Sequence, residues 1–129
     1  MDQAVAALLT DLKEKNLLDS TIVWLAGEFG RVPKVDRQAP WNGGRNHFPR
    51  CFSALIAGGG LKGGVAVGVS DDTTDKVKER PVTPPDFLGT ICERMGVDPD
   101  DRLPSAKKDF RQSVMPKGSD CGRLKELYA

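Results

Sequence analysis

Two uninterrupted apolar runs constrain the fold of this chain more than any other feature of its sequence. They cover residues 21–26 (TIVWLA) and 51–57 (CFSALIA), and neither shows the regular polar alternation of a half-exposed strand. Strands with this pattern are buried on both faces, as in parallel sheets that are covered by helices. We therefore predict an α/β fold built on a parallel sheet.

Apolar spacing and capping residues predict one helix before these runs and one after them. Apolar residues recur at i, i+3, i+4 and i+7 within residues 3–15, which is one face of an amphipathic helix. Thr83 can cap the second helix, because Pro84 suits the first helical position and Asp86 lies three residues after the cap. Gly96 is expected to end this helix.

The rest of the chain is less regular. A glycine-rich turn at 58–64 follows the second apolar run, and a weaker strand is predicted at 65–69. From residue 102 onward, seven Lys or Arg face three Asp or Glu, and apolar residues are sparse. We predict that residues 1–101 form the C-terminal part of an α/β domain and that 102–129 form a basic, loosely ordered tail.

Charge and the length of the apolar runs exclude two classes of partner. The formal net charge is +1, so we expect no electrostatic attraction to nucleic acid or to an anionic membrane. The longest apolar run is far shorter than the ~20 residues that span a bilayer. The chain also lacks the basic and apolar segments of a signal peptide. We expect a cytoplasmic protein if the chain stands alone, and an exported one if it belongs to a longer precursor.

The three cysteines predict neither a disulfide framework nor a thiolate zinc site. Cys51, Cys92 and Cys121 are odd in number and show no C-x-x-C spacing. Cys51 and Cys92 lie within apolar stretches, and free cysteine behaves as a small hydrophobic residue. We therefore interpret these two as core residues.

Charged side chains and the only histidine stand directly beside the two apolar runs. Glu28 and Arg31 follow the first run, whereas Arg45 and His47 precede the second. Ligands of open α/β sheets bind at the carboxyl ends of the strands, so we expect Glu28 and His47 to lie near one another at that edge. A carboxylate and a neutral imidazole are metal ligands, and guanidinium groups bind oxyanions. We predict Glu28 and His47 as metal ligands and Arg31 and Arg45 as contacts to a phosphate or sulfate.

A purely structural interpretation of the same residues stays open. A partly desolvated carboxylate needs a cation, a metal or backbone donors, and Arg31 or Arg45 could supply the cation for Glu28. His47 could be only a hydrogen-bonding residue. No nucleophile is predicted, because Ser53 lies inside an apolar run and no serine stands in a G-x-S-x-G setting.

Four motifs in a fixed order resemble the C-terminal part of a bacterial family of sulfatase-like proteins. They are GEFGRVP at 27–33, GRNHFPR at 44–50, AGGGLKGG at 57–64 and RPVTPPDFL at 80–88. That family, largely catalogued as a domain of unknown function, is placed in the alkaline phosphatase superfamily. The resemblance implies a parallel-sheet α/β fold, of which this chain holds only the C-terminal portion. It also implies hydrolysis of phosphate or sulfate esters at a divalent metal such as zinc or calcium.

Within this resemblance, His47 matches a histidine ligand, and Glu28 keeps the acid of an Asp-His pair whose imidazole is replaced by Phe29. The family usually has Asp where this chain has Asn46. A strand with the nucleophile and a cluster of further acidic ligands are missing from the sequence.

We therefore expect the C-terminal portion of a metal-dependent sulfatase-like or phosphatase-like hydrolase, inactive as this chain alone. The alternative is a non-catalytic, truncated or degenerate homologue that acts as a binding or structural module. Two helices do not suffice to cover both faces of the expected strands, so a second copy of the chain, a separate partner or a missing N-terminal portion is expected to cover the remainder.

Overall fold

The computed structural model describes residues 2–40, 42–104, 113–115 and 122–129. The described part of the chain is built from two α-helices, two short 3-10 helices (η) and six short strands. In chain order these are α1 (Asp2–Glu14), η1 (Leu18–Ser20), β1 (Ile22–Ala26), β2 (Gly30–Arg31), β3 (His47–Phe48), β4 (Ala54–Gly58), β5 (Val69–Ser70), β6 (Val77–Glu79), α2 (Pro84–Arg94) and η2 (Lys125–Leu127).

Both predicted helices are present, and α2 begins where its capping residues predict. The Thr83 hydroxyl accepts a hydrogen bond from the backbone N–H of Asp86, and the Asp86 carboxylate accepts one from the backbone N–H of Thr83. This reciprocal pair satisfies two N–H groups that a helix start leaves without partners. Gly96, with φ +78°, follows the helix in the left-handed conformation that glycine adopts without strain.

The predicted parallel sheet is wrong. The two apolar runs form strands β1 and β4, but these pair antiparallel, with Ile22 opposite Gly58 and Ala26 opposite Ala54. Every strand pair in the described part of the chain is antiparallel. The reason lies in the connection, because a parallel pair needs a crossover, usually a helix, and the described residues between β1 and β4 contain none. The chain returns as a long hairpin, so these residues do not form a parallel-sheet, alkaline phosphatase-like fold.

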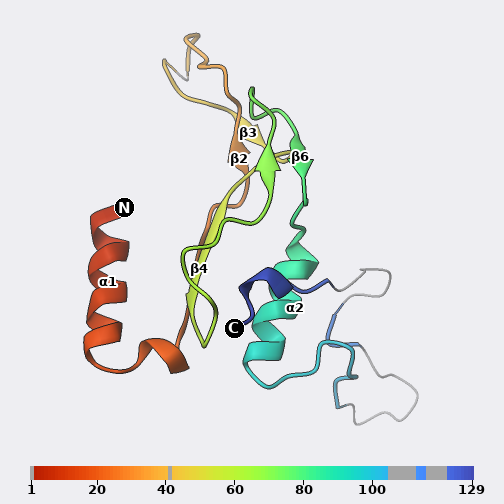
Figure 1. The fold of residues 1–129 in the computed structure, drawn as a ribbon. Coiled ribbons are helices and arrows are strands. Elements are labelled where there is room, and N and C mark those ends of the chain that lie inside the picture. The colour runs from red at the N-terminus through yellow and green to blue at the C-terminus, as the bar shows by residue number, and fades with distance from the viewer. Residues whose placement is uncertain (1, 41, 105–112, 116–121) are drawn as a thin grey trace.

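This hairpin gives the molecule an extended ribbon. β2 and β3 pair antiparallel and continue the direction of β1 and β4 toward a loop at the top of Figure 1. β5 and β6 form a separate short hairpin beside it. Each of these two hairpins has strands of two or three residues, which is too short for an apolar period to be recognised in the sequence.

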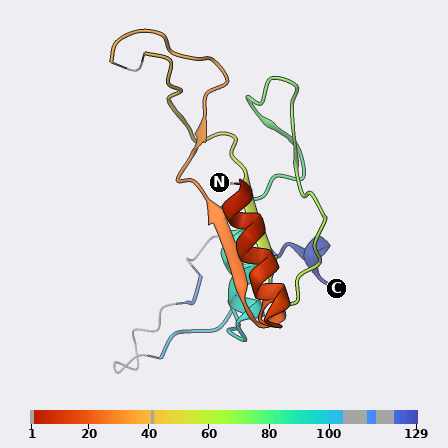
Figure 2. The ribbon, with the colours of Figure 1, turned by 90° about the vertical axis from the view of Figure 1, so that its left-hand side faces the viewer.

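The helices lie on opposite sides of the β1–β4 ribbon, with α1 running along one face (Figures 1 and 2). On the other face the ring of Trp24 packs on that of Phe87 from α2, with 5.4 Å between the centroids. The strands are nevertheless not buried on both faces as predicted, since Trp24 is 50% and Leu55 is 38% exposed. The helix described on each side therefore covers its face only in part.

The tightest packing lies between α2 and the last described segment. Leu124 and Leu127 are only 2% and 6% exposed, and Thr90 of α2 is completely buried. The Thr90 hydroxyl donates to the carbonyl oxygen of Asp86 and accepts from the backbone N–H of Leu124 at 2.9 Å. Residues 122–129 belong to the region expected to be a loose tail, yet they provide the most buried leucines of the described chain. The domain boundary at residue 101 stays a prediction.

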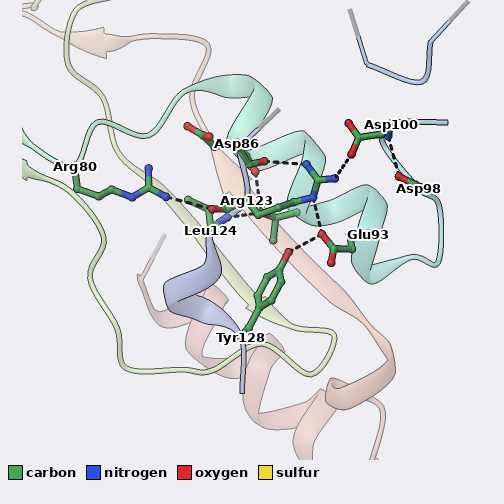
Figure 3. Close-up of polar contacts among 10 residues, drawn as sticks. Arg80, Asp86, Glu93, Asp98, Asp100, Arg123, Leu124 and Tyr128 are labelled. Atoms are coloured by element: carbon green, nitrogen blue, oxygen red, sulfur yellow. Dashed lines mark hydrogen bonds and ion pairs between the residues drawn. The ribbon is translucent and has the colours of Figure 1, made fainter. Parts of the chain in front are cut away.

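Ion pairs connect residues 122–129 to α2 and to Arg80 (Figure 3). The Arg123 guanidinium lies against the carboxylate of Glu93, which also accepts a hydrogen bond from the Tyr128 hydroxyl at 3.0 Å. Arg80 pairs with Glu126 in the same way. The hydrogen bonds from Arg123 and Tyr128 lower the pKa of Glu93, and the bond from Arg80 lowers the pKa of Glu126.

Two further expectations can be compared with this fold. Cys51 and Cys92 are free thiols and only half-buried, so they are not part of the tight core, and Cys121 lies outside the described residues. Among the described helices, none is long and apolar enough to cross a membrane.

Candidate functional site

The β2–β3 hairpin brings the predicted metal ligands together. Arg31 of β2 pairs with His47 of β3, and Glu28 lies in the turn that enters β2. As a result His47 Nε2 lies 2.7 Å from Glu28 Oε1. The expected proximity of these two residues is confirmed, although it arises from antiparallel pairing and not from the carboxyl edge of a parallel sheet.

Gly30 makes this close approach sterically feasible. A Cβ atom at Gly30 would collide with the carbonyl oxygen of Cys51 and would lie 2.9 Å from that of Phe48. Both obstacles are backbone atoms, which cannot rotate away as a side chain can. Glycine is therefore required where β2 passes the returning chain, and the position of Glu28 relative to His47 depends on it.

Arg31 and Phe29 complete the cluster around Glu28. Arg31 Nη2 lies 3.2 Å from the same Glu28 oxygen that His47 contacts. The ring of Phe29 lies 5.5 Å from the imidazole of His47, measured between centroids. The backbone N–H of Glu28, the charge of Arg31 and the hydrogen bond with His47 lower the pKa of the Glu28 carboxyl group. Glu28 is therefore an ionised acceptor at neutral pH.

The second predicted oxyanion contact is not part of this cluster. Arg45 is exposed in the loop before β3 and makes no ion pair or hydrogen bond within the described residues. The side-chain amide of the neighbouring Asn46 donates a hydrogen bond to the carboxylate of Asp36 at 3.5 Å. Asn46 is thus engaged with Asp36 and does not support His47. The structural alternative for Glu28, an ion pair with a nearby arginine, is present with Arg31.

Glu28 and His47 fit part of a metal site. A carboxylate oxygen and an imidazole nitrogen are ligand types that zinc and similar divalent ions accept, and here they are close enough to share one ion. Catalytic zinc sites take three protein ligands. In the described part of the chain, no group of three or more His, Cys, Asp or Glu side chains is placed to hold an ion. The described residues therefore supply two ligands, and a complete site would need another.

An open cleft extends from this cluster along the ribbon. Its volume is about 1070 Å³, and it runs between the β1–β4 sheet, residues 62–70 and α2. Glu28 and Arg31 belong to its wall, together with apolar side chains such as those of Trp24 and Phe87. The polar cluster is thus accessible from a larger, mainly apolar space.

Sequence reasoning did not identify Gly30 and Phe29 as site residues. Gly30 left a signal, since a glycine within a strand often marks a close backbone approach. Phe29 was noted only as the residue that replaces an imidazole of the resembling family. Its contact with His47 was not predicted, because an exposed aromatic side chain in a loop has no period that would reveal it.

A family model described as "Protein of unknown function (DUF1501)" matches residues 1–117. The chain belongs to the DUF1501 family. No curated protein and no solved structure matches the chain. The DUF1501 match includes Glu28, Arg31 and His47 as well as both α-helices, so the candidate site belongs to the matched region, whereas η2 lies beyond it.

Proposed function

We propose that this chain forms the C-terminal, metal-binding portion of a metal-dependent hydrolase of phosphate or sulfate esters. The observation that supports this best is the 2.7 Å contact between Glu28 and His47, with Arg31 beside it. The resemblance of the GEFGR and GRNHFPR motifs to sulfatase-like proteins of the alkaline phosphatase superfamily supports the reaction class.

Each residue of the cluster has a definite task in this proposal. Glu28 and His47 would hold the ion, and a bound divalent ion would polarise an ester oxygen or activate water. Arg31 stays on the edge of the pair with half of its side chain exposed, where its remaining N–H groups can donate two parallel hydrogen bonds to an oxyanion. Gly30 keeps the two ligand-bearing segments in contact.

The chain by itself is proposed to bind the ion without turning over an ester. Two protein ligands are fewer than the three that hold a catalytic zinc. In addition, no serine, threonine or cysteine beside a base was recognised in the sequence, so a covalent route lacks its nucleophile. Catalysis would require further residues next to Glu28 and His47.

A second candidate function is a non-catalytic binding or structural module. It is favoured by the fact that Arg31 and His47 both contact the same oxygen of Glu28, so the carboxylate is already satisfied without a metal. In that case the cluster fixes the hairpin, and it contributes little to stability because all three side chains are more than half exposed.

Calorimetric titration with Zn²⁺ distinguishes the two functions. The metal-binding function predicts a single site in the wild-type chain, whose affinity falls at least about tenfold in Glu28→Gln, because an amide replaces a charged ligand. Glu79→Gln, which makes the same change at an exposed position of β6, is the control and leaves the affinity unchanged. Absence of wild-type binding, or equal affinities in both variants, would favour the structural module.

A further inference from the structure

The outer edge of β1 is unpaired in the described part of the chain. β1 pairs with β4 alone, and within the described ranges no strand lies on its other side. The backbone groups of β1 that point away from β4 have no hydrogen-bond partner in that part of the chain. A row of free N–H and C=O groups of this kind is a template for pairing with another strand.

β1 contains none of the residues that usually guard a sheet edge. Its sequence, IVWLA, contains no charged residue, no proline and no glycine. The register with β4 is regular over all five residues, so no bulge twists the edge away. The edge is therefore competent to accept a strand.

The molecule also exposes far more surface than its mass requires. A compact protein of 14.0 kDa exposes roughly 6,700 Å², whereas this chain exposes 9820 Å². A standard interface buries only about 800 Å² of each partner. About a quarter of the surface area that this chain exposes beyond the compact value would therefore be enough to form one. In and beside the β1–β4 sheet, Trp24, Phe52 and Leu55 are 38% to 50% exposed.

We propose that the outer edge of β1 is a self-association surface, at which a second copy of the chain adds its own β1 in antiparallel orientation. A two-fold axis at this edge pairs β1 with the β1 of the second copy. The two sheets then become one sheet of four strands, in the order β4, β1, the partner's β1 and the partner's β4. Such isologous pairing is the commonest form of protein dimer. Because β1 carries no charged residue and the net charge of the chain is only +1, electrostatic repulsion between two copies is small.

The two strands of the sheet offer a matched pair of variants. Ala26 of β1 and Ala54 of β4 lie opposite one another in the register, and both are exposed. Ala26→Lys adds a long charged side chain at the proposed edge, whereas Ala54→Lys adds the same group on the neighbouring strand. Lysine is a common guard of natural sheet edges. Circular dichroism is the check that both variants keep the wild-type secondary structure.

Sedimentation velocity at increasing concentration tests the proposal. The wild-type chain is expected to be a dimer at about 100 µM, above the micromolar range of weak standard interfaces. Ala26→Lys is expected to raise the dissociation constant at least about tenfold, and Ala54→Lys to leave it unchanged. Hydrogen exchange at residues 22–26 should slow as the dimer forms. A monomer at this concentration, or equal weakening by both lysines, would overturn the proposal, and a monomer would leave another polypeptide as the partner.

Discussion

At the scale of single residues, the two arginines near the hairpin have different surroundings. Arg31 contacts Glu28 directly, whereas Arg45 makes no ion pair in the described part of the chain. Both arginines stand beside the apolar runs, so the sequence alone did not show which of them contacts Glu28. A long arginine side chain can reach several partners, and only the geometry of the hairpin selects one. Glu28 follows β1 and His47 precedes β4, so the two meet because these strands run antiparallel. The predicted parallel pairing would have placed them at opposite ends of the sheet, so their proximity was expected for the wrong reason.

The difference between the arginines leads to a prediction about the charge state of Glu28. The positive charge of Arg31 is one of the causes that lower the pKa of Glu28, so Arg31→Gln should raise that pKa toward its ordinary value. Arg45→Gln is the matched control and should leave it unchanged. A pH titration of the Glu28 side-chain carboxyl carbon by NMR measures both. An equal response to the two substitutions would show that Arg31 has no specific role.

At the scale of secondary-structure elements, local signals predicted both α-helices and the strands β1 and β4, but not how the strands pair. The weaker strand predicted at 65–69 is wrong except for Val69, where β5 begins. The capping box of α2 was visible because Thr83, Pro84 and Asp86 act within one turn. An apolar run indicates a strand but contains no information about its direction relative to a partner, so β1 and β4 were placed correctly and paired wrongly. The buried leucines of 122–129 were missed, because two leucines in a short segment show no period.

The β2–β3 hairpin should depend on Gly30. Gly30→Ala places a Cβ against the carbonyl oxygen of Cys51, and we expect a loss of about 1–3 kcal/mol in the free energy of unfolding, as for overpacked sites. Zinc affinity should fall with it, because Glu28 and His47 separate. Gly63→Ala is the control, since nothing lies within 4 Å of its Cβ, and its effect should stay within about 0.5 kcal/mol. Urea unfolding and calorimetry give the two quantities.

The contact between α2 and the last described segment should depend on the Thr90 hydroxyl. Thr90→Val keeps the shape of the side chain but leaves the buried N–H of Leu124 without its acceptor, which costs about 1–3 kcal/mol. The Leu124 amide should then exchange with solvent faster than in the wild type. Thr90→Ser retains the hydroxyl and should preserve slow exchange. If the amide exchanges equally in the two variants, the hydrogen bond does not hold the segment in place.

At the scale of the whole molecule, the fold is a ribbon with a helix on each side and a core near one end (Figure 1). Such a scaffold exposes its polar cluster and its cleft to solvent, with Glu28, Arg31 and His47 all more than half exposed. Enzymes strengthen electrostatic interactions by excluding water from the site. The described residues form no such enclosure around the cluster, so its charged groups stay in contact with solvent.

We therefore predict that the chain alone does not hydrolyse para-nitrophenyl sulfate or para-nitrophenyl phosphate above the uncatalysed rate, with or without added Zn²⁺. The nucleophile and the enclosed site each account for several orders of magnitude in rate, and neither is recognised here. Release of nitrophenolate is followed by absorbance. Turnover that survives repeated purification and disappears in Glu28→Ala would contradict this prediction.

The central claim is that Glu28 and His47 bind one divalent ion, and the histidine itself offers the most direct measurement. His47 is the only histidine of the chain, so the imidazole nitrogen signals in a ¹⁵N NMR spectrum belong to one residue. Addition of Zn²⁺ is predicted to shift these signals until one ion is bound per chain, and the shift should be lost or need far more zinc in Glu28→Gln. Imidazole signals that do not move, or that move equally in wild type and variant, would contradict the claim.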